Sequence, residues 1–188
     1  LKVANLEGYL FPDTYSFRAQ SADSQIIRIL IGNFLDRLRK YGVTDLDSLR
    51  KLLILASLVE REAKYDDERP IIARVFLNRL QSGRPLESCA TIIYALKNDP
   101  YDLYDPDEVQ KTVLTEKDLK VQSPYNTYLY AGLPPGPICS PGEKSMAAVI
   151  NPANVDYLYF VAKGDGHHQF SRTYKEHLAA KTHYIDKK

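Results

Sequence analysis

Residues 52–64 constrain the fold of this chain more than any other segment, because they read LLILASLVEREAK and carry one polar side chain, Ser57, in the first eight positions. Apolar residues recur here at spacings of three and four, which is the period of a helix. A helix that is apolar all round is buried within a domain. The apolar stripe consists of Leu52, Leu55, Ala56, Val59 and Ala63. The sequence therefore predicts a buried helix that ends in acidic residues.

Glu60 directly follows the apolar run, at the edge of the apolar stripe. We therefore expect its carboxyl group to be partly desolvated. Desolvation favours the protonated form of a carboxyl group, which a general acid needs at neutral pH. The alternative is a structural helix end in which Glu60 pairs with Lys64, four residues later. We expect Glu62 on the opposite border of the stripe and Arg61 to point outward.

The overall charge argues against two classes of partner. The chain has 188 residues and a formal net charge of +1, so nothing indicates binding to nucleic acid or to an anionic membrane surface. Its longest apolar run has eight residues, whereas a membrane-spanning helix needs about 20. The chain does not begin with Met, and we expect it to be a fragment of a longer protein.

Periodicity and turn residues divide the chain into helices followed by strands. We expect helices over residues 21–41, 44–64 (starting with a Thr44/Asp47 box), 66–83, 89–97, 143–150 and from 173 onward. Residues 157–162 and 168–171 are predicted to form a hairpin, and residues 125–130 have a β-rich alternation. Residues 1–18 should be extended, and residues 98–120 and 132–142 should be loops. This order predicts the α+β class: a helical N-terminal half around a buried helix, then a small antiparallel sheet and a terminal helix.

The sequence predicts no metal site and no cofactor. Adjacent His167 and His168 would point to opposite faces of a strand, and no His-Glu-x-x-His motif occurs. A nucleophilic pairing of Cys139 with a histidine stays an alternative, although the usual signatures around a catalytic cysteine are missing. The remaining possibility is acid–base catalysis by carboxyl groups, as in glycosidases. The candidates are Glu7, Asp13, Glu60, Glu62 and Glu68, and their spacing does not say which of them face each other.

A set of short motifs occurs in one order along nearly the whole chain. They are LEGYLFPDTY (6–15), ASLVERE (56–62), ER (68–69), VFLNRL (75–80), LESCATIIYAL (86–96), SPYNTY (123–128), GLPPGPI (132–138), NP (151–152), LYFVA (158–162) and HQF (168–170). With this set the chain resembles the catalytic region of the MltG (YceG-like) endolytic murein transglycosylases. The resemblance implies that residues 1–188 form a YceG-like catalytic domain that cuts peptidoglycan glycan strands internally.

The resemblance also implies a role for Glu60, because the family's catalytic glutamate is the first Glu of a Ser-x-Val-Glu-x-Glu stretch. Such enzymes leave a 1,6-anhydro-muramic acid end instead of adding water. One carboxyl group suffices, first as acid and then as base, since the nucleophile is the sugar's own hydroxyl group and is already in place.

Further residues are expected to support this chemistry. We expect substrate contacts from Tyr125, Asn126, Thr127, Tyr128, Asn78, Thr91 and His168. We expect Glu7, Glu62, Glu68, Arg69 and Arg79 to hold the site in shape, with Glu62 or Glu68 pairing with Arg69. A structural role is the alternative for each: a core strand for 125–128, and a brace or helix cap for Asn78 and Arg79.

One departure from the family pattern, the expected setting of the whole protein and two rival functions complete the predictions. Many relatives carry an Asp near position 88, where this chain has Ser88 and Cys89, so any role of that Asp is lost or moved. The resemblance implies a single membrane-spanning helix and a LysM-like lobe ahead of Leu6, a location at the extracytoplasmic face of the bacterial membrane, and peptidoglycan synthases as partners. Rival functions are a hydrolysing muramidase with Glu62 or Glu7 as base, and a non-catalytic glycan-binding or scaffold module.

Overall fold

The structure is a computed structural model that describes residues 5–43, 45–97 and 114–185. Its helices are α1 (Asp23–Lys40), α2 (Leu46–Glu62), α3 (Arg69–Gln81), α4 (Cys89–Lys97), the 3₁₀ helix η1 (Asp118–Lys120), α5 (Glu143–Ile150) and α6 (Tyr174–Tyr184). Two strands, β1 (Tyr159–Ala162) and β2 (His168–Ser171), pair antiparallel. The predicted α+β class is therefore confirmed.

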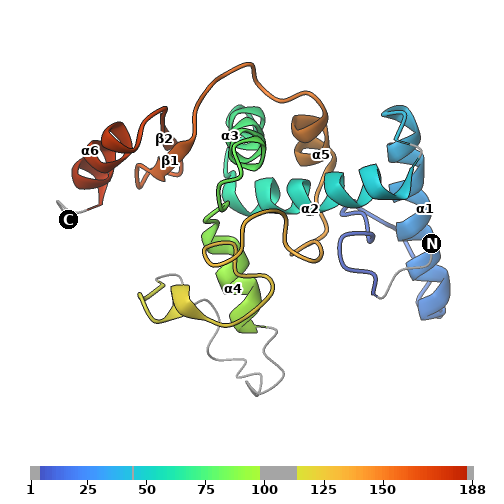
Figure 1. Ribbon diagram of the computed structural model, residues 1–188. Helices are drawn as coiled ribbons and strands as arrows, with labels where there is room; N and C mark the ends of the chain where they lie inside the picture. The colour runs from blue at the N-terminus through green and yellow to red at the C-terminus, as the bar shows by residue number, and fades with distance from the viewer. Residues whose placement is uncertain (1–4, 44, 98–113, 186–188) are drawn as a thin grey trace.

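Helix α2 is the central element of the helical part. It crosses the middle of the molecule, with α1 at one end, α3 and α5 along one side, and α4 on the other (Figure 1). Every residue from Leu52 to Val59 is buried, as the apolar run predicts. Such a helix needs partners on all sides, which explains why the other helices gather around it.

Two hydrophobic clusters meet on α2. One cluster joins Leu55, Leu58 and Val59 to Ile72 and Phe76 of α3. The other cluster joins the first turns of α2 to α1 and to the N-terminal segment. Its members include Leu49, Leu52, Leu53, Phe34, Leu38, Tyr9, Phe11 and Met146. Packing on both sides holds α2 rigidly, and with it the glutamate in its last turn.

The hairpin and α6 lie at the end of the molecule opposite the N-terminus (Figure 1). In the register of the hairpin, Phe160 is paired with Phe170 and Ala162 with His168. Phe160 packs edge-on against Phe76 of α3, with ring centroids 5.8 Å apart. The hairpin is thus attached to the same helix that packs on α2.

The proline-rich loop 132–142 is fastened along α2. Arg50 donates a hydrogen bond to the carbonyl of Pro135 at 2.6 Å, and the buried Ser57 hydroxyl accepts one from the amide of Ile138 at 3.0 Å. Gly8, at φ +85°, packs so tightly on Pro137 that an added Cβ would lie 2.6 Å from the proline ring. Ser57, the one polar residue of the apolar run, is therefore a loop anchor.

The structure differs from the sequence predictions in several places. Strand β1 starts at Tyr159 instead of residue 157, and η1 falls within the predicted loop 98–120. Residues 125–130 form turns instead of a strand, because the side-chain oxygen of Asn126 accepts the amide of Tyr128 at 2.9 Å and closes a local turn. Helix α2 starts from Asp45, whose carboxylate accepts the amide of Ser48; the predicted Thr44 lies outside the described residues, as does most of the predicted loop 98–120. None of the described helices has the length and apolar character to span a membrane.

Candidate active site

One oxygen of Glu60 collects three hydrogen-bond donors from two other helices. Oε2 of Glu60 accepts the hydroxyl of Ser145 at 2.7 Å, the backbone amide of Gly142 at 3.1 Å and a guanidinium nitrogen of Arg69 at 3.3 Å. The last turn of α2 thus meets the N-terminal ends of α3 and α5. Three donors on one oxygen fix the plane of the carboxyl group.

Ser145 connects the two helix ends. Its side chain is fully buried, and its hydroxyl accepts a hydrogen bond from Arg69 at 2.6 Å. Because that bond occupies a lone pair, the hydroxyl proton is available to Glu60. Gly142 is the N-cap of α5, so Glu60 also faces the positive end of that helix.

Arg69 is itself held from a second side. Its Nε donates to the carboxylate of Asp66 at 3.0 Å, and only 12% of its side chain is exposed. The ammonium group of Lys144 also pairs with Asp66. Asp66 therefore orients the guanidinium group of Arg69, and Lys144 in turn holds the carboxylate of Asp66.

The second oxygen of Glu60, Oε1, takes part in none of these hydrogen bonds. No hydrogen bond joins it to any residue in the described part of the chain, and 31% of the Glu60 side chain is exposed. The alternative pairing of Glu60 with Lys64 is not formed. Lys64 lies over the ring of Tyr65 instead, 5.5 Å from its centroid. Glu60 is thus partly desolvated and fixed by one oxygen, with the other available to a ligand.

The thiol of Cys139 is within electrostatic reach of both Glu60 and Glu7. Burial raises the pKa of the Cys139 thiol to about 12, and the charges of Glu60 and Glu7 add to the rise. The thiol reaches the carbonyl of Ser57 at 3.5 Å. A thiol with so high a pKa is a poor nucleophile at neutral pH, which argues against the Cys139–histidine alternative.

Glu62, two residues further along α2, belongs to a separate cluster. It accepts a hydrogen bond from the hydroxyl of Ser88 at 2.6 Å. Beside it, the thiol of Cys89 contacts the hydroxyl of Tyr128 at 3.1 Å. Burial raises the pKa of Cys89, and the charge of Glu62 raises it further. Ser88 thus fixes the carboxylate of Glu62 on α2.

Glu68 holds the hairpin to the start of α3. Its buried carboxylate accepts the amide of His168 at 2.9 Å and contacts Nδ1 of His168 at 2.8 Å and Nδ1 of His167 at 3.2 Å. Burial raises the pKa of Glu68, but the hydrogen bonds from His168 outweigh burial and lower it overall. The two histidines therefore share a carboxylate, contrary to the expectation that they point apart. Neither Glu62 nor Glu68 pairs with Arg69, which binds Glu60 and Asp66 instead.

Asn78 and Arg79 brace the chain that leads into β1. The amide of Asn78 donates to the carbonyls of Val155 and Tyr157 at 3.1 and 2.9 Å. Arg79 donates to the carbonyl of Leu158 at 2.7 Å and pairs with Glu87 at 2.8 Å. These contacts fit the structural alternative. The predicted substrate contact of Asn78 stays a prediction.

Of the predicted groove residues, Asn126, Thr127 and Thr91 are buried, while Tyr125 and Tyr128 are half-buried. Asn126 and Thr91 are fully buried. Asn126 donates to the carbonyls of Leu119 and Val121 at 3.0 and 2.8 Å, while Thr127 shares a 2.9 Å hydroxyl contact with Thr91. Tyr125 packs against Tyr94, with ring centroids 4.7 Å apart. Their contacts with a substrate stay predictions, as does that of His168.

The structure therefore brings Arg69 to Glu60, and the charge of Glu7 acts on the thiol of Cys139. Glu62, Glu68, Asn78 and Arg79 have other partners. Sequence reasoning missed Gly142 and Ser145, which lie 82 and 85 residues from Glu60 along the chain. No spacing rule indicates such contacts. Within residues 5–43, 45–97 and 114–185, no group of His, Cys, Asp and Glu has the arrangement of a metal site.

Comparisons with known proteins point to one family. The YceG-like family model matches residues 1–183. The chain is 40% identical, over 97% of its length, to the endolytic murein transglycosylase of Bacillus subtilis (strain 168), and it covers 49% of that protein. It is 36% identical, over 84% of its length, to the endolytic murein transglycosylase of Streptococcus pneumoniae serotype 2 (strain D39), and it covers 28% of that protein.

A crystal structure leads to the same group. The putative yceG-like protein from Listeria monocytogenes superimposes with a TM-score of 0.77 at 39% identity, over 93% of this chain and 55% of that one. The chain thus spans about half the length of the relatives from B. subtilis and L. monocytogenes, and less of the streptococcal protein.

Proposed function

Because the chain belongs to the YceG-like family, we propose that it is the catalytic part of an endolytic peptidoglycan lytic transglycosylase. The observation that carries the proposal is the arrangement of Glu60, with Oε2 bound by three donors and Oε1 open. The names of relatives 40% and 36% identical to the chain support the reaction class.

In the first step, Glu60 acts as a general acid. The proton is carried on Oε1, because Oε2 is already occupied by Ser145, Gly142 and Arg69. It passes to the glycosidic oxygen between muramic acid and the next glucosamine, and the bond from that oxygen to the muramic anomeric carbon breaks. Negative charge develops on Glu60 as the proton leaves, and the three donors at Oε2 are already placed to stabilise it.

In the second step, the same group acts as a base. The carboxylate takes the proton of the C6 hydroxyl of the muramic acid, and that oxygen forms a bond to the anomeric carbon. The product ends in a 1,6-anhydro ring, Glu60 is protonated again, and no water is consumed. An intramolecular nucleophile replaces the positioned water that a hydrolase requires.

A hydrolysing muramidase is the second candidate function, and one observation favours it. Glu7 lies near enough to Cys139 to raise the pKa of the same thiol that Glu60 acts on, so a second carboxylate is in the neighbourhood. Glu62 is the less suitable base, because it is bound to Ser88. The mass of the products separates the two reactions, since hydrolysis adds a water.

The test is a digest of purified peptidoglycan, with products identified by mass spectrometry. We expect anhydro-muropeptides from the unaltered chain, and about 10³-fold less product from Glu60→Gln, since the residue serves as both acid and base. Asp36→Asn, which removes an exposed carboxylate on α1, is the matched control. Products with reducing ends would show a hydrolase instead. No product from the folded, unaltered chain would contradict the proposal for this chain.

We also propose where the protein acts and with what. Its substrate would be peptidoglycan glycan strands, which places it at the extracytoplasmic face of the bacterial membrane, held by an N-terminal anchor of the whole protein. Peptidoglycan synthases are the proposed partners, because they produce the strands to be cut. Fractionation of cells and co-purification with cross-linking test these two points.

A further inference from the structure

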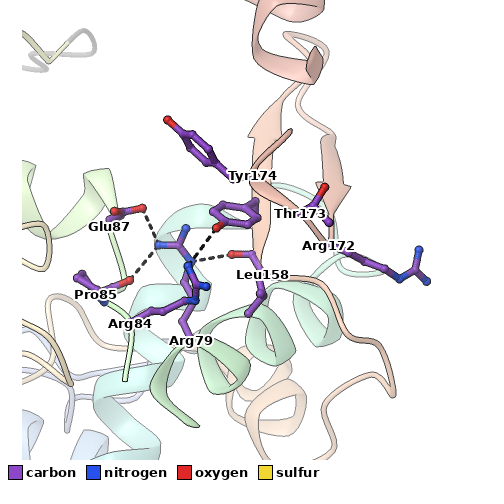
Figure 2. Close-up of a pocket in the computed structure, with 9 residues that line it drawn as sticks. Arg79, Arg84, Pro85, Glu87, Leu158, Arg172, Thr173 and Tyr174 are labelled. Atoms are coloured by element: carbon purple, nitrogen blue, oxygen red, sulfur yellow. Dashed lines mark hydrogen bonds and ion pairs between the residues drawn. The ribbon is translucent and has the colours of Figure 1, made fainter. Parts of the chain in front are cut away.

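A cavity of about 710 Å³ opens on the side of the molecule near α6. It lies between the C-terminal end of α3, residues 84–87, β1 and the start of α6, and its lining includes Arg79, Arg84, Glu87, Tyr159 and Tyr174 (Figure 2). This volume lies within the usual range for ligand pockets. None of the predicted substrate residues lines it.

Among the described residues, one guanidinium group of the cavity lacks a carboxylate partner. Arg79 is 8% exposed and paired with Glu87 at 2.8 Å. Arg172 pairs with Asp156 at 2.6 Å, and its side chain points away from the other arginines in Figure 2. Arg84 is exposed and, within the described part of the chain, donates only to the hydroxyl of Tyr159, at 3.2 Å. Arg84 is therefore available for an anionic group.

Two further observations concern the groups around this cavity. Glu87 reaches Arg79 from a backbone at φ 52°, a left-handed conformation that residues other than glycine rarely adopt. Behind Tyr159, the ring of His177 is stacked at 5.2 Å; burial lowers its pKa, and the charges of Arg79 and Lys181 lower it further. The exposed guanidinium of Arg84, which pairs with no carboxylate among the described residues, attracts a negative group.

We propose that this cavity binds the carboxylate groups of a peptide. A guanidinium group recognises a carboxylate through paired hydrogen bonds, and the exposed ring of Tyr174 offers a flat surface to a peptide backbone. Tyr174 is 60% exposed at the rim. Given the proposed function, on which this step rests, the peptide is the stem that muramic acid carries in peptidoglycan.

The spacing along α3 suits such a ligand. Arg69, beside Glu60, and Arg79, in the cavity, are ten residues apart on one helix, which corresponds to about 15 Å. An extended peptide of five residues reaches about 17 Å. A stem attached to a muramic acid at Glu60 is therefore long enough to reach the Arg79 end of α3, where the cavity with Arg84 lies.

The first experiment measures binding without catalysis. The probe is the pentapeptide L-Ala-γ-D-Glu-L-Lys-D-Ala-D-Ala with an N-terminal fluorophore, titrated with the chain by fluorescence anisotropy. We expect Arg84→Ala to weaken binding about tenfold, as the loss of a charge-assisted hydrogen bond requires. Arg39→Ala, which removes an exposed arginine on α1, is the matched control and should bind normally. Unchanged affinity in Arg84→Ala would overturn the proposal.

Two further arms identify the chemistry. A probe whose carboxylates are amidated should bind about tenfold more weakly to the unaltered chain and equally to both Arg84 forms. Inorganic phosphate should compete only weakly. If phosphate displaces the probe as effectively as the free peptide does, the cavity is a general anion site and the assignment to a peptide is wrong.

A digest separates this proposal from the proposed function. On glycan strands that carry stems, Arg84→Ala should lower kcat/KM about tenfold through a higher KM. On strands freed of stems by an amidase, it should match the unaltered chain. Equal loss on both substrates would overturn the stem-binding role while leaving Glu60 chemistry intact. Peptide binding in a chain that cuts neither substrate would instead contradict the proposed function alone.

Discussion

Replacing Ser145 by alanine tests whether the donors at Oε2 of Glu60 contribute to catalysis. The hydroxyl makes the shortest of the three bonds to that oxygen, 2.7 Å against 3.1 Å for Gly142 and 3.3 Å for Arg69. A hydrogen bond to a charged group contributes about 1.5–3 kcal/mol. If this bond stabilises the charge that develops on Glu60 in the transition state, its loss should lower kcat about 10- to 100-fold.

KM should stay unchanged, because Ser145 is fully buried and does not reach the substrate. The alanine variant also leaves one bond of Arg69 unmade, so we expect a loss of about 1–3 kcal/mol in the free energy of unfolding. For a chain of this size, that lowers Tm by about 2–12 °C. The rate of anhydro-muropeptide release, measured by mass spectrometry, gives kcat and KM, and circular dichroism gives Tm.

Ser57→Ala is the control for stability. Ser57 is as buried as Ser145, but its hydroxyl bonds to the carbonyl of Ile54 and the amide of Ile138. It should lose similar stability and keep most of its kcat. If the two variants lose kcat to the same extent, the effect of Ser145 is structural, and the reasoning about charge on Glu60 fails.

Three further outcomes follow from the same contacts. Glu60→Gln removes one of the charges that, after burial, raise the pKa of Cys139 to about 12; the pKa should fall, and alkylation of Cys139 at pH 9, located by peptide mass mapping, should accelerate. Identical alkylation profiles would contradict the placement of these groups. The pKa of Glu68 is lowered below 4.5 in the folded state, so its contribution to stability is complete above pH 4.5 and is lost as the pH falls below it. Glu68→Gln should flatten that part of the stability curve in urea titrations, and an unaltered slope would argue against the bond with His168. Leu58→Ala, at a fully buried position of α2, should cost about 2–5 kcal/mol in urea unfolding, and a loss below about 1 kcal/mol would show that α2 is not central.

Local patterns predicted most of the helical part of this protein. The apolar run of residues 52–59 forced α2 into the centre, and Cys89–Lys97, Glu143–Ile150 and the strand His168–Ser171 have the predicted bounds. Each of these elements is defined by residues close in sequence, so periodicity and turn residues suffice. The β-rich prediction for residues 125–130 was wrong, because the side chain of Asn126 closes a turn with the amide of Tyr128. Such a local hydrogen bond competes with β-propensity.

The site could be predicted only in part. Glu60 stood out because a charged residue directly follows an apolar run, and that signal is local. Gly142 and Ser145 gave no such signal: the first is a glycine among several in a proline-rich loop, and the second is an ordinary helix residue. Their role depends on how α5 packs on α2, which is decided by the hydrophobic clusters and not by the site itself.

The position of Glu60 in its own helix is a conflict that the rest of the fold resolves. Glu60 and Glu62 lie in the last turn of α2, where the helix dipole disfavours a negative charge, and Arg61 is the one basic residue there. The N-terminus of α5 and the guanidinium group of Arg69 supply the opposite field at Oε2. Local preference and global structure disagree in this way mainly at functional sites. In the proposed reaction, this carboxyl group, which its own helix repels and two neighbouring helices stabilise through Oε2, exchanges its proton through Oε1.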